Sequence, residues 1–398
     1  LSNNNGVLID SIRAITLGED NSYGRLPDGS DNLIHLEFFS PNTSNNNTSQ
    51  LVFSKPAGFY NNPFHINIKS LQDDTVYYSL DGSLPNMNSY ILNDSIFMYD
   101  KSIENNYFSI IPSSNNSTWV NPTNLIDKAN IVRCVSYKNG RPSSSIYTQT
   151  YFINSDSTNQ YGVPVISLVT AENNLFDSDL GIYVPGIYFN ENAEAPIWTG
   201  NFFQKGILWE RPIHIEYFNK LGFRDFFQDS GIRIHGGLSR SYPQKSIRLY
   251  ARSDYGKPKF NYPLLSQTNN KDYTRFILRS SMSSWNNSMI TDIVAHDIVK
   301  DLNIDNQDYR PVIVFINGEY WGMHTIRDYI NEDYINYTHG IHSDSIILLE
   351  GTESIYNTFK NIFNTIDQNE LNEIEAYSYI ESEIDIDSYL YYQISEMF

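Results

Sequence analysis

The feature that most constrains the fold is a series of short segments in which apolar and polar residues alternate. Five of them lie between residues 51 and 153: "FHINIKS", "TVYYSLDGS", "SYILN", "ANIVRCVSYKNG" and "SSIYTQTYFI". Gly, Pro or Asn separates them at roughly regular spacing, as between the strands of a sandwich. The chain's 30 Tyr and 22 Phe residues agree with this, because aromatic side chains favour strands. The sequence therefore predicts an all-β unit, a β-sandwich, over residues 51–153.

The segments on either side of this unit differ from it. Residues 1–50 contain the Pro-Asp-Gly hairpin signal "YGRLPDGSDN" and end in the polar linker "SPNTSNNNTSQ". From about residue 160, predicted strands are followed by helices, which is typical of an α+β domain over 160–398. The clearest helix is expected at 288–304, where an apolar stripe is formed by Ile290, Val294, Ile298 and Leu302. Two more helices are expected at "IYNTFKNIFNTI" and "IDIDSYLYYQISEMF".

Charge and cysteine content exclude several classes of protein. A net charge of −19 disfavours nucleic acid as a general partner, because phosphate would be repelled at every approach. The single cysteine, Cys134, allows neither an intrachain disulfide nor a cysteine-based zinc site, and its alternating context predicts a small buried hydrophobe. No apolar run reaches the length of a membrane span.

One stretch opposes the general acidity: "GIRIHGGLSRSYPQKSIRLYARS", residues 231–253, has five Arg or Lys residues and no acid. Side chains alternate across a strand, so Lys245 shares the parity of the apolar residues Ile247 and Leu249. A lysine on the covered side of a sheet is costly unless an anion meets it. The pattern therefore predicts an inward lysine with an anionic partner.

The turn before this strand has the residue types of a phosphate site. Gly236 and Gly237 allow backbone N–H groups to approach an anion, and Arg240 adds a guanidinium fork. Together with Lys245 this is the electrostatic layout of a nucleotide-phosphate site. The alternative is a tight hairpin whose lysine extends its ammonium to the edge.

A second region, "RPVIVFINGEYWGMHTIRDYINEDYI" (310–335), predicts a hairpin that turns at Asn317-Gly318. Asp328 follows its return strand and is a candidate partner for Lys245. The alternative is a solvated charge near a helix start, stabilised by the helix dipole. "DLNIDNQD" (301–308) alternates acids like a calcium loop but lacks the central Gly and distal Glu, so no metal ligand is predicted.

Four ordered phrases over roughly residues 160–398 resemble the spore coat protein H (CotH) kinase family. They are "PVISLVTAENNLFD…GIYV", "GIRIHGGLSRSYPQKSIRLYAR", "FILRSSMSSWNNSMITDIVAHDIV" and "RPVIVFINGEYWGMHTIRDYINEDYI". Upstream, "VYYSLDGSLP" resembles a chitobiase C-terminal-like or fibronectin-III-like sandwich. Residues 1–50 resemble the C-terminal remnant of a lamin-tail-like β domain followed by a linker. Both companions occur in secreted bacterial proteins.

The resemblance implies an atypical kinase with a protein-kinase-like core. Such an enzyme transfers the ATP γ-phosphate, with Mg²⁺ or Mn²⁺, to Ser or Thr of extracellular, surface or coat proteins. It implies that Lys245 and Arg240 contact phosphate and that Asp328, where the family has Glu, orients Lys245. "SIILLEG" (345–351) resembles the strand that leads to the adenine side.

The family's catalytic and metal-holding aspartates follow the helix at the end of this sequence. Both are therefore expected beyond Phe398, so the kinase domain is expected to be truncated and these residues alone to be inactive. The alternative function is a non-catalytic cell-surface adhesion module on a kinase-like scaffold. A third possibility is that residues 51–153 bind a glycan for a larger secreted enzyme.

Overall fold

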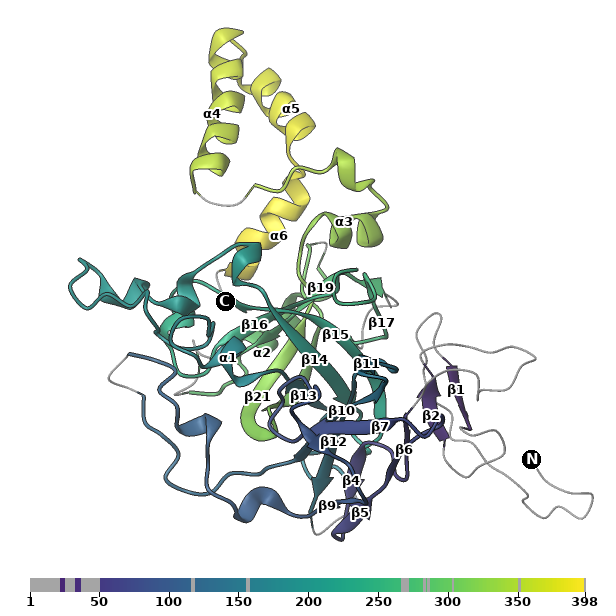
Figure 1. The fold of residues 1–398 in the computed structure, drawn as a ribbon. Coiled ribbons are helices and arrows are strands. Elements are labelled where there is room, and N and C mark those ends of the chain that lie inside the picture. The colour runs from purple at the N-terminus through teal and green to yellow at the C-terminus, as the bar shows by residue number, and fades with distance from the viewer. Residues whose placement is uncertain are drawn as a thin grey trace, which may run out of the picture. The chain divides into compact units, whose positions relative to one another are not determined.

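The computed structural model divides the chain into two compact units, which are described separately. The first contains Leu1–Met282 and Arg310–Ile326, and the second contains Ser283–Tyr309 and Arg327–Phe398. The structure describes residues 22–25, 33–36, 51–115, 119–154, 158–265, 272–281, 284, 287–302, 304–349 and 352–396. Figure 1 labels their strands and helices where there is room.

The hairpin predicted near the N-terminus is present. Strand β1 (Ser22–Arg25) pairs antiparallel with β2 (Leu33–Leu36), in a register that joins Arg25 to Leu33. The Pro-Asp-Gly turn, the linker and the rest of residues 1–50 lie outside the described residues.

Residues 51–153 are rich in β structure, as the alternation predicted. One sheet has the strand order β4-β12-β10-β7-β8, with β11 also paired to β10, and β3-β6 and β5-β9 form two further pairs. The bounds are β3 Leu51–Phe53, β4 Gly58–Tyr60, β5 Phe64–Ile66, β6 Ile68–Ser70, β7 Thr75–Ser79, β8 Tyr90–Ile91, β9 Ile96–Met98, β10 Asn130–Lys138, β11 Arg141–Pro142 and β12 Tyr147–Ile153. Their core includes Cys134, whose burial raises the pKa of its thiol and confirms the predicted apolar role.

A closed barrel forms the other half of the first unit (Figure 1). Its strands, in spatial order, are β13 (Val165–Val169), β14 (Arg211–Phe218), β15 (Arg224–His235), β16 (Ser246–Tyr250), β19 (Arg275–Arg279), β21 (Glu319–Arg327) and β20 (Tyr309–Ile316). Closure depends on the parallel pairing of β13 with β20, which the sequence did not predict. The barrel interior is filled by branched and aromatic side chains such as Ile247, Leu249 and Phe276.

Two smaller elements accompany the barrel. Strand β17 (Phe260–Asn261) pairs with β18 (Asp272–Tyr273), and the short helix α1 (Glu172–Leu175) follows β13. The hairpin predicted at 310–335 is confirmed, because β20 returns as β21 through Asn317 and Gly318, which have φ values of 46° and 84°. Two successive positive φ angles are those of a tight hairpin turn.

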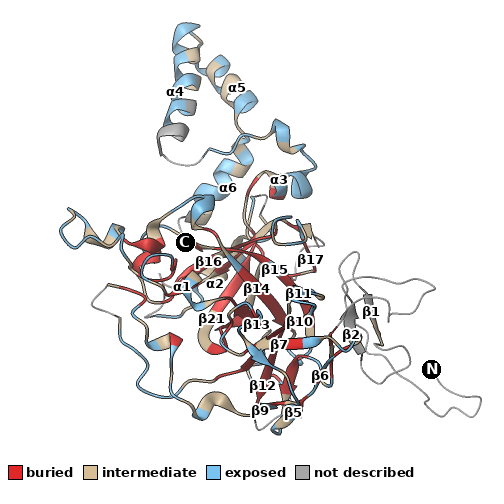
Figure 2. Ribbon diagram, in the orientation of Figure 1, coloured by how far each residue is buried: buried red, intermediate tan, exposed pale blue. Residues whose placement is uncertain are grey.

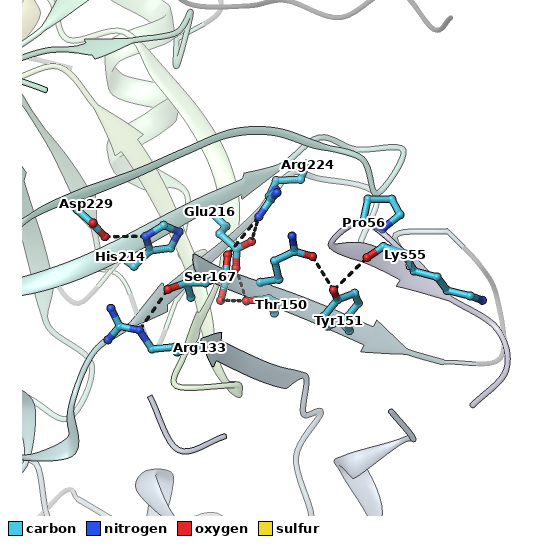
Figure 3. Close-up of polar contacts among 12 residues, drawn as sticks. Lys55, Pro56, Arg133, Thr150, Tyr151, Ser167, His214, Glu216, Arg224 and Asp229 are labelled. Atoms are coloured by element: carbon cyan, nitrogen blue, oxygen red, sulfur yellow. Dashed lines mark hydrogen bonds and ion pairs between the residues drawn. The ribbon is translucent and has the colours of Figure 1, made fainter. Parts of the chain in front are cut away.

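The sheet of residues 51–153 packs on the barrel through an aromatic cluster and a buried polar network. Phe59 stacks on Phe152 with ring centroids 4.3 Å apart, and both contact Phe218 of β14. Beside them, the hydroxyl of Thr150 donates to the fully buried carboxylate of Glu216, which also accepts from Arg224 at 2.6 Å (Figure 3). Because buried charges require partners, this network fixes how the two β layers meet.

The helices of the second unit are α2 (Thr291–Val299), α3 (Glu332–His339), α4 (Thr352–Gln368), α5 (Glu373–Glu383) and α6 (Ile386–Glu396). Local signals set two of their ends: Asn372 and Glu375 form a capping box at α5, and Gly340 ends α3 with a left-handed conformation. The three helices predicted from the sequence are present as α2, α4 and α6. Helix α2 (Thr291–Val299) is shorter than the predicted range 288–304.

The apolar stripe of α2 is exposed: Ile298 is 69% exposed, and Ile290 and Val294 are exposed as well. One other prediction is wrong. Residues 345–349 of the predicted "SIILLEG" strand form no strand: Ser343–Ser345 is a 3-10 turn and the next four residues are irregular. Figure 2 shows burial concentrated in the strands of the first unit, whereas α5 and α6 carry mainly exposed or partly exposed residues.

Candidate functional site

Lys245 lies immediately before β16 with its side chain inside the first unit. It is 0% exposed, as are Ile247 and Leu249, so the inward parity predicted from the sequence is confirmed. Its ammonium donates to the backbone carbonyls of Arg240, at 2.6 Å, and Tyr242, at 2.7 Å. The same nitrogen lies 4.1 Å from the ring centroid of Phe202.

Burial strongly disfavours the charged form of this lysine. Desolvation holds the pKa of Lys245 well below its usual 10.5, and in the described part of the chain no carboxylate acts to raise it. Two carbonyls and an aromatic face therefore meet the ammonium here, instead of the carboxylate or bound anion that the sequence argument required.

The backbone around Lys245 is also held in place. Its N–H donates to the hydroxyl of Tyr183 at 3.0 Å, and that hydroxyl also accepts from the indole of Trp321 at 2.8 Å. The imidazole of His324 donates from Nε2 to the Lys245 carbonyl at 3.3 Å. Burial lowers the pKa of His324 to about 4, so this histidine is neutral at physiological pH. These contacts set the position of the lysine rather than its chemistry.

The structure brings Arg240 and both glycines together with Lys245. Arg240 Nε donates to the Gly236 carbonyl at 2.5 Å, and the Arg240 N–H donates to the Gly237 carbonyl at 3.1 Å. Gly236 has a φ of 111° and a Cβ there would lie 2.4 Å from Ser239 Oγ, so this position requires glycine. A Cβ on Gly237 would meet nothing within 4 Å, which leaves open space beside the turn.

Three arginine side chains surround His235 at the end of β15. We call His235, Arg240, Arg248 and Arg279 the basic cluster. Burial is the main cause that lowers the pKa of His235 to about 3, and the charges of the three arginines lower it further. Arg248 donates from Nη2 to His235 Nδ1 at 2.6 Å, so the neutral imidazole is the acceptor. The local field is strongly positive although the chain is acidic, which favours an anionic ligand.

Sequence reasoning missed His235, Arg248 and Arg279. The available signal was strand parity, which places Arg248 on the face opposite Ile247, but the pairing of β16 with β19 was needed to add Arg279. The two other arginines of the basic stretch serve a different purpose. Arg233 binds Glu210 at 2.6 Å and Arg252 binds the same carboxylate at 2.7 Å.

Asp328 lies in the second unit, directly after β21. Its side chain is buried, and Oδ2 has no hydrogen-bond partner in the described structure. Burial, and then the charge of Asp308, raise the pKa of Asp328 to about 7. A buried carboxylate in this state would be stabilised by a cation. Since Lys245 belongs to the first unit, its pairing with Asp328 stays a prediction.

No metal site is assigned. Among the residues that the structure describes, no three or more His, Cys, Asp or Glu side chains form a group that could hold an ion. Within that same part of the chain, no helix is both long and apolar enough to cross a membrane.

Comparison with known proteins confirms the resemblance found in the sequence from residue 232 onward, and the part over residues 160–231 stays a prediction. The family model described as CotH kinase protein matches residues 232–398, a stretch that begins within β15 and includes Lys245, the whole basic cluster and Asp328. A search of the curated proteins gives no match to this chain. The lamin-tail-like and chitobiase-like descriptions of the upstream residues stay predictions.

Proposed function

We propose that this chain is part of a secreted or cell-surface atypical kinase of the CotH type. It would transfer the γ-phosphate of ATP, with Mg²⁺ or Mn²⁺, to Ser or Thr of an extracellular or surface protein. The family match over residues 232–398 supports the kinase class. We also propose that residues 51–153 form a β-sandwich and that the barrel and the helices together have a protein-kinase-like fold.

The observation that carries the proposal is the basic cluster beside a buried lysine that has no acidic partner in the described structure. A polyphosphate placed beside Arg240 and Arg248 would compensate the positive charge of the basic cluster and of Lys245, because arginine guanidinium groups bind phosphate oxygens. Arg240 would have to exchange carbonyl partners for it, since its Nε and Nη1 donate to the carbonyls of Gly236, Phe202 and Gln204. The open space beside Gly237 would allow the phosphates to approach the turn.

Direct contact between Lys245 and a phosphate requires a local rearrangement. The carbonyls of Arg240 and Tyr242 occupy its ammonium, so the turn at Leu238–Ser241 would have to withdraw from it. Lys245 would then exchange two carbonyls for the phosphate and for Asp328. A Lys–carboxylate pair that positions phosphates is a recurring device in phosphoryl transfer.

Nucleotide binding is the direct test. The 398-residue chain is titrated with ATP by isothermal calorimetry in the presence of Mg²⁺ or Mn²⁺. We expect binding that weakens at least tenfold in Lys245→Met and in Arg248→Gln. Lys138→Gln is the matched control, since Lys138 lies on β10 with a side chain 55% exposed. Absence of binding, or equal affinity in all four proteins, would overturn the proposal. Transfer of radiolabelled γ-phosphate is measured separately.

The second candidate, a non-catalytic adhesion module, is favoured by one segment of the chain. Between residues 177 and 210 large apolar side chains are exposed, with Leu208 the most open at 84%: Leu180, Ile187, Tyr188, Trp198, Ile207 and Leu208. Exposed apolar surface of this kind often marks a protein interface. Partner binding that survives Lys245→Met in the absence of ATP would support this function.

A further inference from the structure

A cavity lies where residues 51–153 meet the barrel, away from the basic cluster. Its volume is about 230 Å³, and both β layers supply its walls. Leu84, Arg133 and Ile146 come from the N-terminal layer, while Ile213, Asp229 and Ser230 are among the residues from the barrel. The volume is below the roughly 300–1,000 Å³ of sites for drug-sized ligands. It suits a smaller molecule.

Arg133 supplies a positive charge with unused hydrogen-bonding capacity. It is buried in β10, where Nε donates to Thr148 Oγ1 at 3.1 Å and Nη1 to the Gly82 carbonyl at 2.9 Å. These two bonds fix the guanidinium, and its other terminal nitrogen, Nη2, has no hydrogen bond in the described structure. Arginine does not lose its proton in proteins, so a cation faces this cavity permanently.

Asp229 supplies the opposite charge from β15. Its Oδ1 accepts from His214 Nδ1 at 2.7 Å (Figure 3), and its side chain is 53% exposed although it lines a cavity. Burial alone would raise the pKa of Asp229, but the hydrogen bond and charge of His214 and the charge of Arg133 lower it. Asp229 is therefore ionised, with Oδ2 available to a ligand.

The two charges do not neutralise each other directly. Arg133 and Asp229 are close enough to shift each other's pKa, yet no ion pair within 4.0 Å joins them. The rest of the wall includes the apolar residues Leu84, Ile146 and Pro212. Thr170, Asn174 and Tyr255 add polar atoms to it.

We propose that this cavity binds a free α-amino acid with an aliphatic side chain. The ligand's carboxylate would bind Arg133, its ammonium would bind Asp229, and its side chain would contact Leu84, Ile146 and Pro212. A purely anionic ligand would be repelled by Asp229 and a purely cationic one by Arg133, whereas a zwitterion satisfies both. A neutral polyol would leave both ionic contacts unused.

Three related probes test the charge requirement. The 398-residue chain is titrated by calorimetry with L-leucine, with leucinamide, which lacks the carboxylate, and with 4-methylpentanoate, which lacks the ammonium. We expect L-leucine to bind at least tenfold more tightly than either of the others. Glucose is the fourth probe. Binding of glucose without binding of leucine would overturn the proposal in favour of a polyol site, and so would equal binding of the three charge variants.

Two variants test the position of the site. Asp229→Asn keeps the shape and a hydrogen-bond acceptor for His214 but removes the charge, so leucine affinity should fall at least tenfold. Ile146→Phe should reduce binding by filling the cavity. Asp94→Asn, at an exposed acid outside the cavity, is the control and should bind like the parent chain. Circular dichroism verifies folding. Unchanged affinity in folded Asp229→Asn, or no leucine binding to the parent chain, refutes the proposal.

Discussion

Replacing Lys245 with Met should change how the stability of the first unit depends on pH. The folded chain disfavours the proton on Lys245, because desolvation holds the pKa well below 10.5. The unfolded chain keeps that proton up to about pH 10.4. The unfolded state therefore binds more protons in the window below that value, and the contribution of Lys245 to stability rises with pH.

The size of this effect follows from linkage. One proton held only by the unfolded chain gives a slope of about 1.4 kcal/mol per pH unit. The slope reaches this value over the pH range in which the folded chain has lost the Lys245 proton and the unfolded chain still holds it. Met has no titratable group, and the variant should lose this slope. Its two freed carbonyls, on Arg240 and Tyr242, should lower stability by about 1–3 kcal/mol each at high pH.

The measurement is urea unfolding at intervals between pH 7 and 9.5, followed by tryptophan fluorescence. The quantity compared is the difference in unfolding free energy between the parent chain and Lys245→Met, which removes the contribution of the tyrosines. As pH rises, the parent chain should become progressively more stable relative to Lys245→Met. Lys138→Met, at an exposed position, should show no such trend. A constant difference for Lys245→Met would refute the conclusion that this ammonium is desolvated without an anion.

Three further outcomes are expected. Glu210→Gln should destabilise the chain by about 2–3 kcal/mol in urea unfolding, because two arginines lose one buried carboxylate. Gly236→Ala should lower the melting temperature through strain of about 1–3 kcal/mol, because of its positive φ and the close approach of Ser239 Oγ. The pKa of Asp328 is raised from 3.8 to about 7, so stability should fall as pH rises through that window; Asp328→Asn should flatten this part of the stability curve.

Local patterns predicted most of the individual elements. Alternation identified the strands of residues 51–153, and Asn317-Gly318 identified the β20–β21 turn, because both signals lie within a few residues. Barrel closure was not predictable in this way, since β13 and β20 are neighbours only in space. The irregular conformation of residues 346–349 shows the same limit, because an apolar run forms a strand only where a partner strand is available.

In the candidate site, too, the features that were predicted depend on residues close in sequence, and those that were missed depend on residues distant in sequence. Strand parity alone placed Lys245 inside, and the glycines and Arg240 are adjacent because they share its turn. The amino-acid cavity could not be predicted, because Arg133 and Asp229 come from different sheets. The ion pairs of the basic stretch could not be predicted from the sequence either. Glu210 lies outside that stretch but binds two of its arginines.

The parallel pairing of β13 with β20 also has a consequence for folding during synthesis. Val165 pairs with Ile313, which is synthesised much later, so the barrel cannot close until β20 has emerged from the ribosome. Until then β13, whose five residues are all buried in the finished barrel, lacks one of its two partner strands. Contacts so distant in sequence slow folding, and unpaired apolar edges promote aggregation. Residues 51–153 pair among themselves much earlier, so this layer can fold first and cover Val165 and Phe218 while the rest of the barrel is still being made.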